Sequence, residues 1–208
     1  QYRQKAELAL DGGPDVLTVI ASGAVLAPGG VPGKQEMTRA EISAVVQAAH
    51  ARGVKVAAHA HGAQSIKDSI LAGVDTVEHA SLIDGEGLKL AKQRNVALSM
   101  DIFNGDYIEE CGSKWPKEFL EKNRQITEKQ RQSFTRAVRE GVTLVYGTDA
   151  GVYPYGQNAR QFKVMVSRGM KPMAAIQSAT SVAAKYMGWE NKVGSVSPGL
   201  FADLVAVE

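Results

Sequence analysis

Short apolar runs recur along the chain and alternate with longer segments of helical periodicity. Each run is rich in Val, Ile or Leu and is bounded by turn residues, which is typical of a strand buried on both faces. The runs predict strands at residues 15–21, 54–59, 74–79, 96–101 and 142–147. Strands of this kind are found mainly in parallel sheets that helices cover.

The segments between the strands carry the start and stop signals of helices. Thr38 and Glu41 fit a capping box, and Pro172 suits a first helical turn. A Gly-Val pair closes three helices and opens the next strand, at Gly53, Gly73 and Gly141. The predicted helices lie at residues 38–52, 63–71, 85–94, 116–139, 158–168 and 172–187. Alternating strands and helices indicate an α/β fold built from right-handed βαβ units.

Composition excludes several classes of protein. The chain has 208 residues, 44% of them apolar, and 24 basic against 22 acidic residues give a net charge of +2. Such scattered, nearly balanced charge provides no surface for nucleic acid or an anionic membrane. The only cysteine, Cys111, excludes an internal disulfide and follows two acidic residues, which makes it a poor nucleophile.

Neither a membrane span nor a leader is visible. The longest nearly apolar run, residues 16–27, is shorter than the about 20 residues that a spanning helix needs. The first residues do not resemble a signal peptide, and the cellular location stays unknown. The chain begins at Gln1 and stops at Glu208 within an apolar alternation, so we expect both ends to be cuts.

Candidate chemistry gathers at the ends of the predicted strands. His59 and His61 end the second strand, His79 ends the third, and Asp149 ends the fifth. The carboxyl ends of parallel strands meet on one face, so these side chains should converge. Imidazole and carboxylate suit a zinc-type divalent metal, which would activate a water, while Asp149 could move the proton.

Other readings apply to individual residues. A single strand-end histidine is more often a hydrogen-bonded core residue than a ligand, and it is the combination of positions that favours a metal. His50 lies in the last turn of a helix, where a histidine can cap carbonyls, so we interpret it as structural. Glu78 should point away from Val77 and His79 as a polar wall residue. Tyr153, in the loop after the fifth strand, could line a pocket.

Four segments resemble the amidohydrolase superfamily. They are VAAHAHG at 56–62, GVDTVEHAS at 73–81, YGTDAGVYP at 146–154 and GSVSPGLFADLVAVE at 194–208. The resemblance is strongest to the imidazolonepropionase-like branch, with its Xaa-Pro and Xaa-Arg/Lys dipeptidases. It implies a TIM-barrel (β/α) fold in which this chain supplies only strands four to eight. Residues 1–202 would form the partial barrel, and 203–208 would begin a strand leading to a small β domain.

The resemblance also implies roles for individual residues. His59 and His79 would be metal ligands, and Asp149 would be both ligand and general base. His61 would contact substrate, together with Tyr153. The superfamily's His-x-His pair on strand one is absent from the chain, and Thr18 stands where a bridging, carboxylated lysine is common. We therefore expect one zinc ion rather than two, with the Thr18 side chain facing the barrel interior.

These observations favour metal-dependent hydrolysis of an amide bond in a dipeptide or N-acyl amino acid, with Asp149 as general base. A partner-dependent or non-catalytic half-barrel, and a mononuclear esterase, remain the alternatives. Five strands of a barrel leave two raw edges. We therefore expect a homo-oligomer or a complementing amino-terminal half, and a small-molecule substrate.

Overall fold

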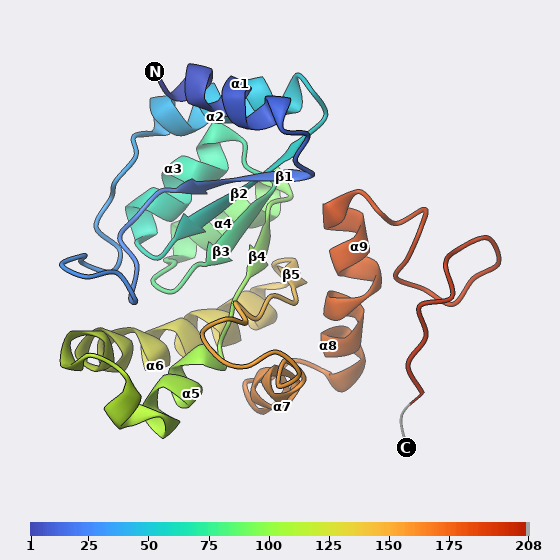
Figure 1. Cartoon of the computed structure of the whole chain (residues 1–208). Coiled ribbons are helices and arrows are strands. Elements are labelled where there is room, and N and C mark those ends of the chain that lie inside the picture. Colours follow the sequence, from blue (N-terminus) through green and yellow to red (C-terminus); the bar gives the residue numbers. More distant parts are fainter. Residues whose placement is uncertain (207–208) are drawn as a thin grey trace.

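The computed structural model describes residues 1–206 and contains one parallel, five-stranded sheet (Figure 1). The strands pair in chain order, β1-β2-β3-β4-β5. Their bounds are β1 Val16–Ile20, β2 Lys55–Ala60, β3 Thr76–His79, β4 Ala97–Ser99 and β5 Leu144–Val145. Sequential parallel strands joined by helices are the arrangement of a (β/α) barrel, so the predicted fold class is confirmed.

Helices fill the intervals between the strands and continue after β5. Their bounds are α1 Tyr2–Asp11, α2 Arg39–His50, α3 Ala63–Ala72, α4 Gly85–Arg94, α5 Asn104–Glu110, α6 Lys117–Glu140, α7 Arg160–Ser167, α8 Pro172–Ala179 and α9 Ser181–Met187, with a 3-10 turn at Gly112–Lys114. Among the described residues, no helix combines the length and apolar character needed to cross a membrane.

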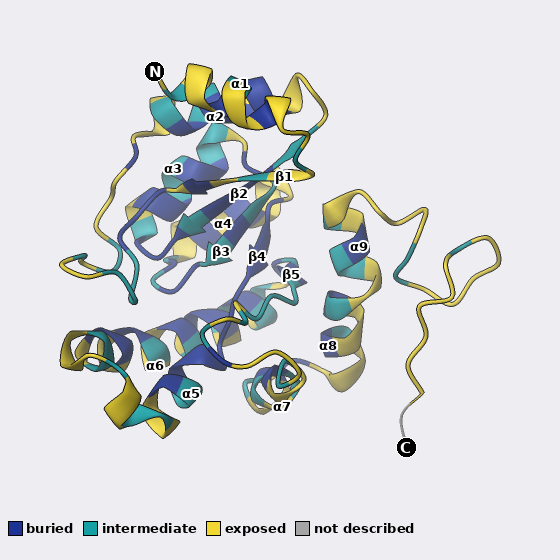
Figure 2. Cartoon of the chain, viewed as in Figure 1, coloured by how far each residue is buried: buried dark blue, intermediate teal, exposed yellow. Residues whose placement is uncertain are grey.

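The strands differ in burial on their two faces, and this difference defines the core. Val56, Ala58 and Ala60 of β2 are fully buried beneath the helices. Figure 2 shows the strands in the middle of the sheet enclosed and the segment after α9 exposed. On the opposite face of β1, Val16 and Ile20 keep 42% and 49% of their surface exposed. The face that would line a barrel is therefore open at β1.

Helix boundaries follow the predicted signals closely in the first half of the chain. The Thr38 hydroxyl accepts from the Glu41 amide, and the Glu41 carboxylate accepts from the Thr38 amide, which completes the predicted capping box. Gly73 and Gly141 end α3 and α6 in the left-handed conformation, where a side chain would be strained.

The second half departs from the prediction in three places. The fifth strand shortens to two residues, and the fourth ends at Ser99. The helix predicted at 172–187 breaks at Thr180, whose φ of −125° and ψ of −98° are not helical. In addition, helix α5, and helix α1 in the first half of the chain, were not predicted. Residues 203–206 have no assigned secondary structure, and residues 207–208, the rest of the expected strand, lie outside the described residues.

Candidate metal centre

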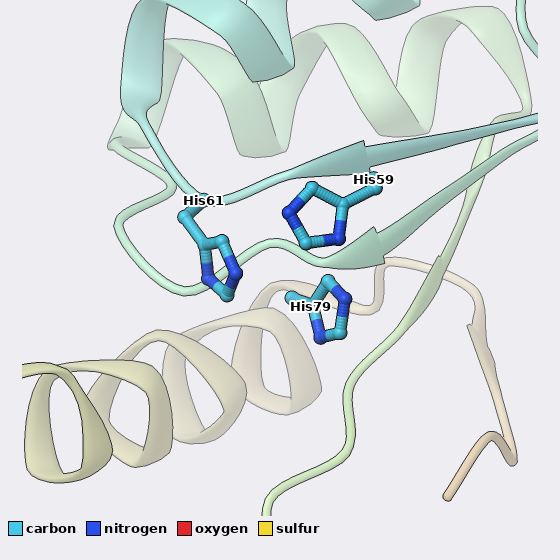
Figure 3. A group of neighbouring side chains, drawn as sticks. All are labelled: His59, His61 and His79. Carbon is cyan, nitrogen blue, oxygen red and sulfur yellow. The ribbon is translucent and has the colours of Figure 1, made fainter. Parts of the chain in front are cut away.

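Three imidazoles gather where β2 and β3 end (Figure 3). His59 lies in β2, His61 follows that strand directly, and His79 ends β3. The ring centroid of His79 is 4.5 Å from that of His59 and 4.6 Å from that of His61. One ring nitrogen from each histidine lies within 4.8 Å of those of the other two. The three rings are therefore close enough together to hold one metal ion.

Backbone contacts fix the position of these histidines. The His59 carbonyl accepts from the Ala21 amide at 2.9 Å, and the His61 amide donates to Ser22 Oγ at 2.8 Å. Gly62 then packs its backbone against Gly33, so closely that a Cβ at Gly62 would collide with the Gly33 carbonyl. Glycine is required there because two loops cross without room for a side chain.

Two carboxylates complete the cluster from the next strands. Asp101 follows β4, Asp149 follows β5, and one oxygen of each lies within 4.8 Å of the other and of a His79 nitrogen. The Asn104 carboxamide donates from Nδ2 to Asp101 Oδ2 at 2.6 Å and to Asp149 Oδ2 at 3.4 Å. His79 thus belongs both to the cluster of three histidines and to the cluster that it forms with Asp101 and Asp149.

The backbone is strained at this edge of the sheet. Among the described residues outside glycine, positive φ values occur at His79 (68°), Ala80 (46°), Asn95 (54°) and Asp149 (49°). Asn95 ends α4, whereas the other three lie at the cluster. Such conformations cost about 1–3 kcal/mol each and persist where surrounding contacts enforce them. Their concentration here marks the strand ends as a functional edge.

Burial keeps two of the imidazoles neutral. Loss of hydration, with a smaller effect from His79, lowers the pKa of His59 from 6.5 to about 4. Loss of hydration and the neighbouring His79 and His59 lower the pKa of His61 to about 3. A neutral imidazole has a lone pair available for a metal, so both rings are in the binding form near neutral pH.

The carboxylates act differently on their neighbours. Burial by itself would lower the pKa of His79, but the Asp101 charge and hydrogen bond outweigh it and raise that pKa to about 9. Burial would raise the pKa of Asp101, yet His79 holds it well below its usual range. Burial, followed by the negative charge of Asp101, raises the pKa of Asp149. Asp149 therefore accepts a proton more readily than an ordinary aspartate.

Two cavities reach the cluster from different sides. One of about 240 Å³ lies on the sheet face and includes Thr18, His59, Glu78 and Asp149 in its lining. The other, of about 150 Å³, lies against α5 and α6 and includes His61 in its lining. His59, His79, Asp101 and Asp149 border both cavities. A small molecule could therefore approach the cluster through either opening.

The predicted site residues are placed as follows. His59, His61 and His79 form one group, and Asp149 forms a second group with His79 and Asp101, so His79 is the member that the two groups share. Tyr153 is buried against the rings of Phe103 and Tyr107 and does not line either cavity. The roles of these residues stay predictions.

Two wall residues can now be placed. Thr18 borders the same cavity as His59 and Asp149, so it faces the interior as expected. Glu78 pairs in register with His59 and borders that cavity too. Val77 is fully buried, so Glu78 is a polar residue of the cavity wall, and His79, with its positive φ, borders the same cavity.

Sequence reasoning missed three polar residues around His79. They are Asp101, Asn104 and Gln130, and each is at least nine-tenths buried. The only available signal was the position of Asp101 at the end of the fourth apolar run, in line with the other strand-end residues. Asn104 begins a helix that was not predicted, Gln130 lies in the distant α6, and no local pattern marks either residue.

The donor set fits a divalent metal. His59 Nε2 is buried and has no hydrogen-bond partner within residues 1–206. His61 Nδ1 contacts Ser81 Oγ and His79 Nδ1 contacts Asp101 Oδ1, each at 2.8 Å, which leaves Nε2 of both rings available. An orphaned buried nitrogen costs free energy unless something binds it. Neutral imidazoles beside carboxylate suit zinc and similar ions.

Known proteins share this architecture. The chain is 29% identical over its whole length to ochratoxinase of Aspergillus niger and covers 44% of that protein. A crystal structure of a Xaa-Pro dipeptidase with bound methionine in the active site matches 96% of the chain at 34% identity, with a TM-score of 0.89. A prolidase complexed with N-methylphosphonate-L-proline matches 97% at 26% identity, with a TM-score of 0.88.

The chain covers 51% and 50% of those two structures, so it spans about half the length of the relatives that it matches. The sequence model of the amidohydrolase family matches residues 1–208. The strand-end histidines and carboxylates occupy the edge at which (β/α) barrels place their active sites. On the match to its family model, this chain belongs to the amidohydrolase family.

Proposed function

We propose that the chain provides the carboxyl-terminal part of the active site of a metal-dependent hydrolase that cleaves amide bonds. The observation that supports this proposal most strongly is the cluster of three imidazoles beside two buried carboxylates at one edge of a parallel sheet. Relatives described as a Xaa-Pro dipeptidase and a prolidase favour a dipeptide or an N-acyl amino acid as substrate.

His59, His79 and Asp149 are the ligands we propose, with zinc as the metal. A bound zinc ion would polarise the carbonyl of the scissile amide and lower the pKa of a water molecule. Its affinity for His59 is favoured by the orphaned Nε2, which gains a partner only when a ligand is present. We propose one ion per chain. A second ion would need a bridging carbamate formed on a lysine, whereas Thr18 offers a neutral hydroxyl at this cavity.

Asp149 would act as the general base. Its raised pKa lets it take a proton from the attacking water and then deliver that proton to the departing amine. His61 is held by Ser81 and Ser22, and its remaining nitrogen could donate to the substrate carbonyl. Tyr153 has a buried hydroxyl without a partner in residues 1–206, and that hydroxyl could bind substrate after a local rearrangement.

The open edge of β1 supports the second part of the proposal, which concerns partners. β1 is the first strand of the sheet and pairs with β2 on one side, and Val16 and Ile20 expose apolar surface on the face that would line a barrel. Parallel strands are stable when both faces are covered. We infer that another copy of the chain, or an amino-terminal half, covers this edge. Light scattering at micromolar concentration should show a species larger than 22.2 kDa, and a stable monomer would contradict the inference.

Hydrolysis assays test the main proposal. The zinc-loaded chain, alone and with a supplied amino-terminal half, is assayed on N-acyl amino acids, dipeptides and matched esters. We expect amide cleavage that Asp149→Asn lowers by about 10²-fold or more, the usual range for a general base. Ester cleavage without amide cleavage would favour the esterase alternative. Zinc binding without either activity would favour a non-catalytic module.

A further inference from the structure

The strongest unassigned feature is a polar network around His79 that the proposed chemistry does not use. We propose that Asp101 is a positioning residue: its carboxylate fixes the ring orientation of His79 and leaves Nε2 as the ring nitrogen that would bind the metal. This inference rests on the proposed function, in which His79 is a metal ligand. Asp101 itself would not bind the ion.

The contact between the two side chains is short and protected. His79 Nδ1 lies 2.8 Å from Asp101 Oδ1, and Asp101 is only 7% exposed. A carboxylate is an acceptor, so it favours the form of the ring that carries a proton on Nδ1. Nε2 is then the nitrogen left for a metal. Carboxylate partners of this kind raise ligand basicity and fix ring orientation in metal sites.

Asp101 is itself held by two amide donors from different helices. Gln130 Nε2, on α6, donates to Oδ1 at 2.9 Å. Asn104 Nδ2, on α5, donates to Oδ2 at 2.6 Å. With the His79 ring, three donors therefore surround the carboxylate, and both of its oxygens are engaged. A carboxylate has about four acceptor sites, and three of them are used here, which favours a fixed support over a ligand that must turn toward an ion.

The same network also holds the strained backbone of His79. Gln130 Nε2 donates to the His79 carbonyl oxygen at 3.2 Å as well as to Asp101. The residue has a φ of 68°, a conformation that surrounding contacts must enforce. One carboxamide thus links the backbone of His79 to the carboxylate that orients its ring. The arrangement fixes the ring through two connected points.

Asn104 extends the network to the proposed base. Its Nδ2 lies 3.4 Å from Asp149 Oδ2, and its Oδ1 is buried without a partner within residues 1–206. An unpartnered Oδ1 means that the carboxamide can rotate by half a turn and accept instead of donate. An asparagine at position 101 could therefore keep its contact with Asn104. It would still offer a neutral acceptor to His79.

This geometry allows a graded test. Zn²⁺ affinity is measured by competition with a chromophoric chelator for the wild-type chain, Asp101→Asn and Asp101→Ala. We expect a loss of about 10-fold for asparagine, which keeps a weaker acceptor, and about 100-fold for alanine. Glu78→Gln is the matched control: Glu78 borders the same cavity, but its carboxylate accepts from Thr76 at 2.6 Å rather than from a histidine. Its affinity should stay close to that of the wild type.

A second readout does not require metal. In the ¹H–¹⁵N spectrum of the metal-free protein, the Nδ1 proton of His79 should be shifted downfield and protected from exchange. Asp101→Ala should abolish that signal, Asp101→Asn should weaken it, and Glu78→Gln should leave it unchanged. A structural role confined to packing would change the melting temperature without this pattern. If Asp101→Ala does not fold, Asp101→Asn is compared with the wild type and with Glu78→Gln instead.

The outcomes separate the two proposals. If both Asp101 variants bind zinc as tightly as the wild type, the positioning role is overturned. It is also overturned if Glu78→Gln loses as much zinc affinity as the Asp101 variants, because loss of negative charge alone would then explain the result. An unprotected Nδ1 proton in the wild type would overturn it too. Failure of the wild-type chain to bind zinc, with the protected proton present, would refute the proposed metal site and leave the Asp101–His79 contact established.

Discussion

The imidazole side and the carboxylate side of the candidate centre are built in different ways. His59 and His79 lie on strands that pair over four residues, from Ala57↔Thr76 to Ala60↔His79. Between β4 and β5 the register covers only Leu98↔Leu144 and Ser99↔Val145, so Asp101 and Asp149 lie beyond the strands. Backbone pairing positions the imidazoles, whereas side chains from α5 and α6 position the carboxylates.

This difference teaches where each side is vulnerable. Strand pairing fixes where the backbone of each histidine lies, although the ring orientation of His79 also depends on Asp101. Carboxylates beyond the strand ends depend on individual donors such as Asn104 and Gln130. Substitutions that disturb the backbone on one side, and hydrogen bonds on the other, should therefore have separable effects.

The largest effect is expected from Gly62→Ala on the imidazole side. A Cβ at Gly62 would collide with the carbonyl of Gly33, and neither backbone can retreat without moving His61. The free energy of unfolding should fall by at least about 3 kcal/mol, measured by urea denaturation. Gly85→Ala is the control, because nothing lies within 4 Å of the added Cβ. Equal stability of the two variants would contradict the crossing of the loops.

Metal-free stability should depend on pH in opposite directions through His59 and through His79. His59 has a folded pKa of about 4 and an unfolded value of 6.5, so the unfolded chain binds more protons and stability falls as pH drops below 6.5. His79 has a folded pKa of about 9, so its contribution is complete below pH 6.5 and is lost as pH rises to 9. Each branch amounts to about 3 kcal/mol.

The free energy of unfolding of the metal-free protein should be highest near pH 6.5, as measured by denaturation curves recorded with chelator. His59→Asn should reduce the acid branch, to which His61 also contributes, and His79→Asn should flatten the alkaline branch. A profile that stays level from pH 6.5 to 9 would show that the Asp101–His79 contact does not hold a proton in the folded protein.

On the carboxylate side, Gln130→Met should cost about 2 kcal/mol of stability. The substitution keeps the length of the side chain but removes one donor to Asp101 Oδ1, which keeps its contact with His79, and the donor to the His79 carbonyl. Thermal and urea denaturation measure the loss. Gln132→Met, at an exposed position on the same helix, should leave stability nearly unchanged. A similar loss in both variants would indicate a general effect on α6.

The smallest effect is expected far from the centre, at His50. Its Nε2 lies 2.9 Å from Asp75 Oδ2, and the side chain is 42% exposed. Exposed ion pairs contribute little, so His50→Gln should change the free energy of unfolding by about 0.5 kcal/mol or less. Zinc affinity measured on the same sample should equal that of the wild type. A large loss of affinity would contradict the structural interpretation of His50.

The sequence predicted the imidazole side better than the carboxylate side for a physical reason. His59 and His79 end apolar runs, and parallel pairing brings the ends of such runs together whatever lies between them. The role of Asp101 depends on burial and on Gln130, and both depend on how α6 packs rather than on any local pattern. The break at Thr180 likewise depends on packing and interrupts an otherwise continuous helical pattern.

Metal stoichiometry tests the central claim most directly. Zn²⁺ is titrated into the metal-free chain while heat and elemental content are recorded, for the wild type and for His59→Asn with His79→Asn. The account predicts one ion per wild-type chain and none in the double variant, with both proteins folded by circular dichroism. A wild-type chain that binds no zinc, or a double variant that binds it equally well, would contradict the account.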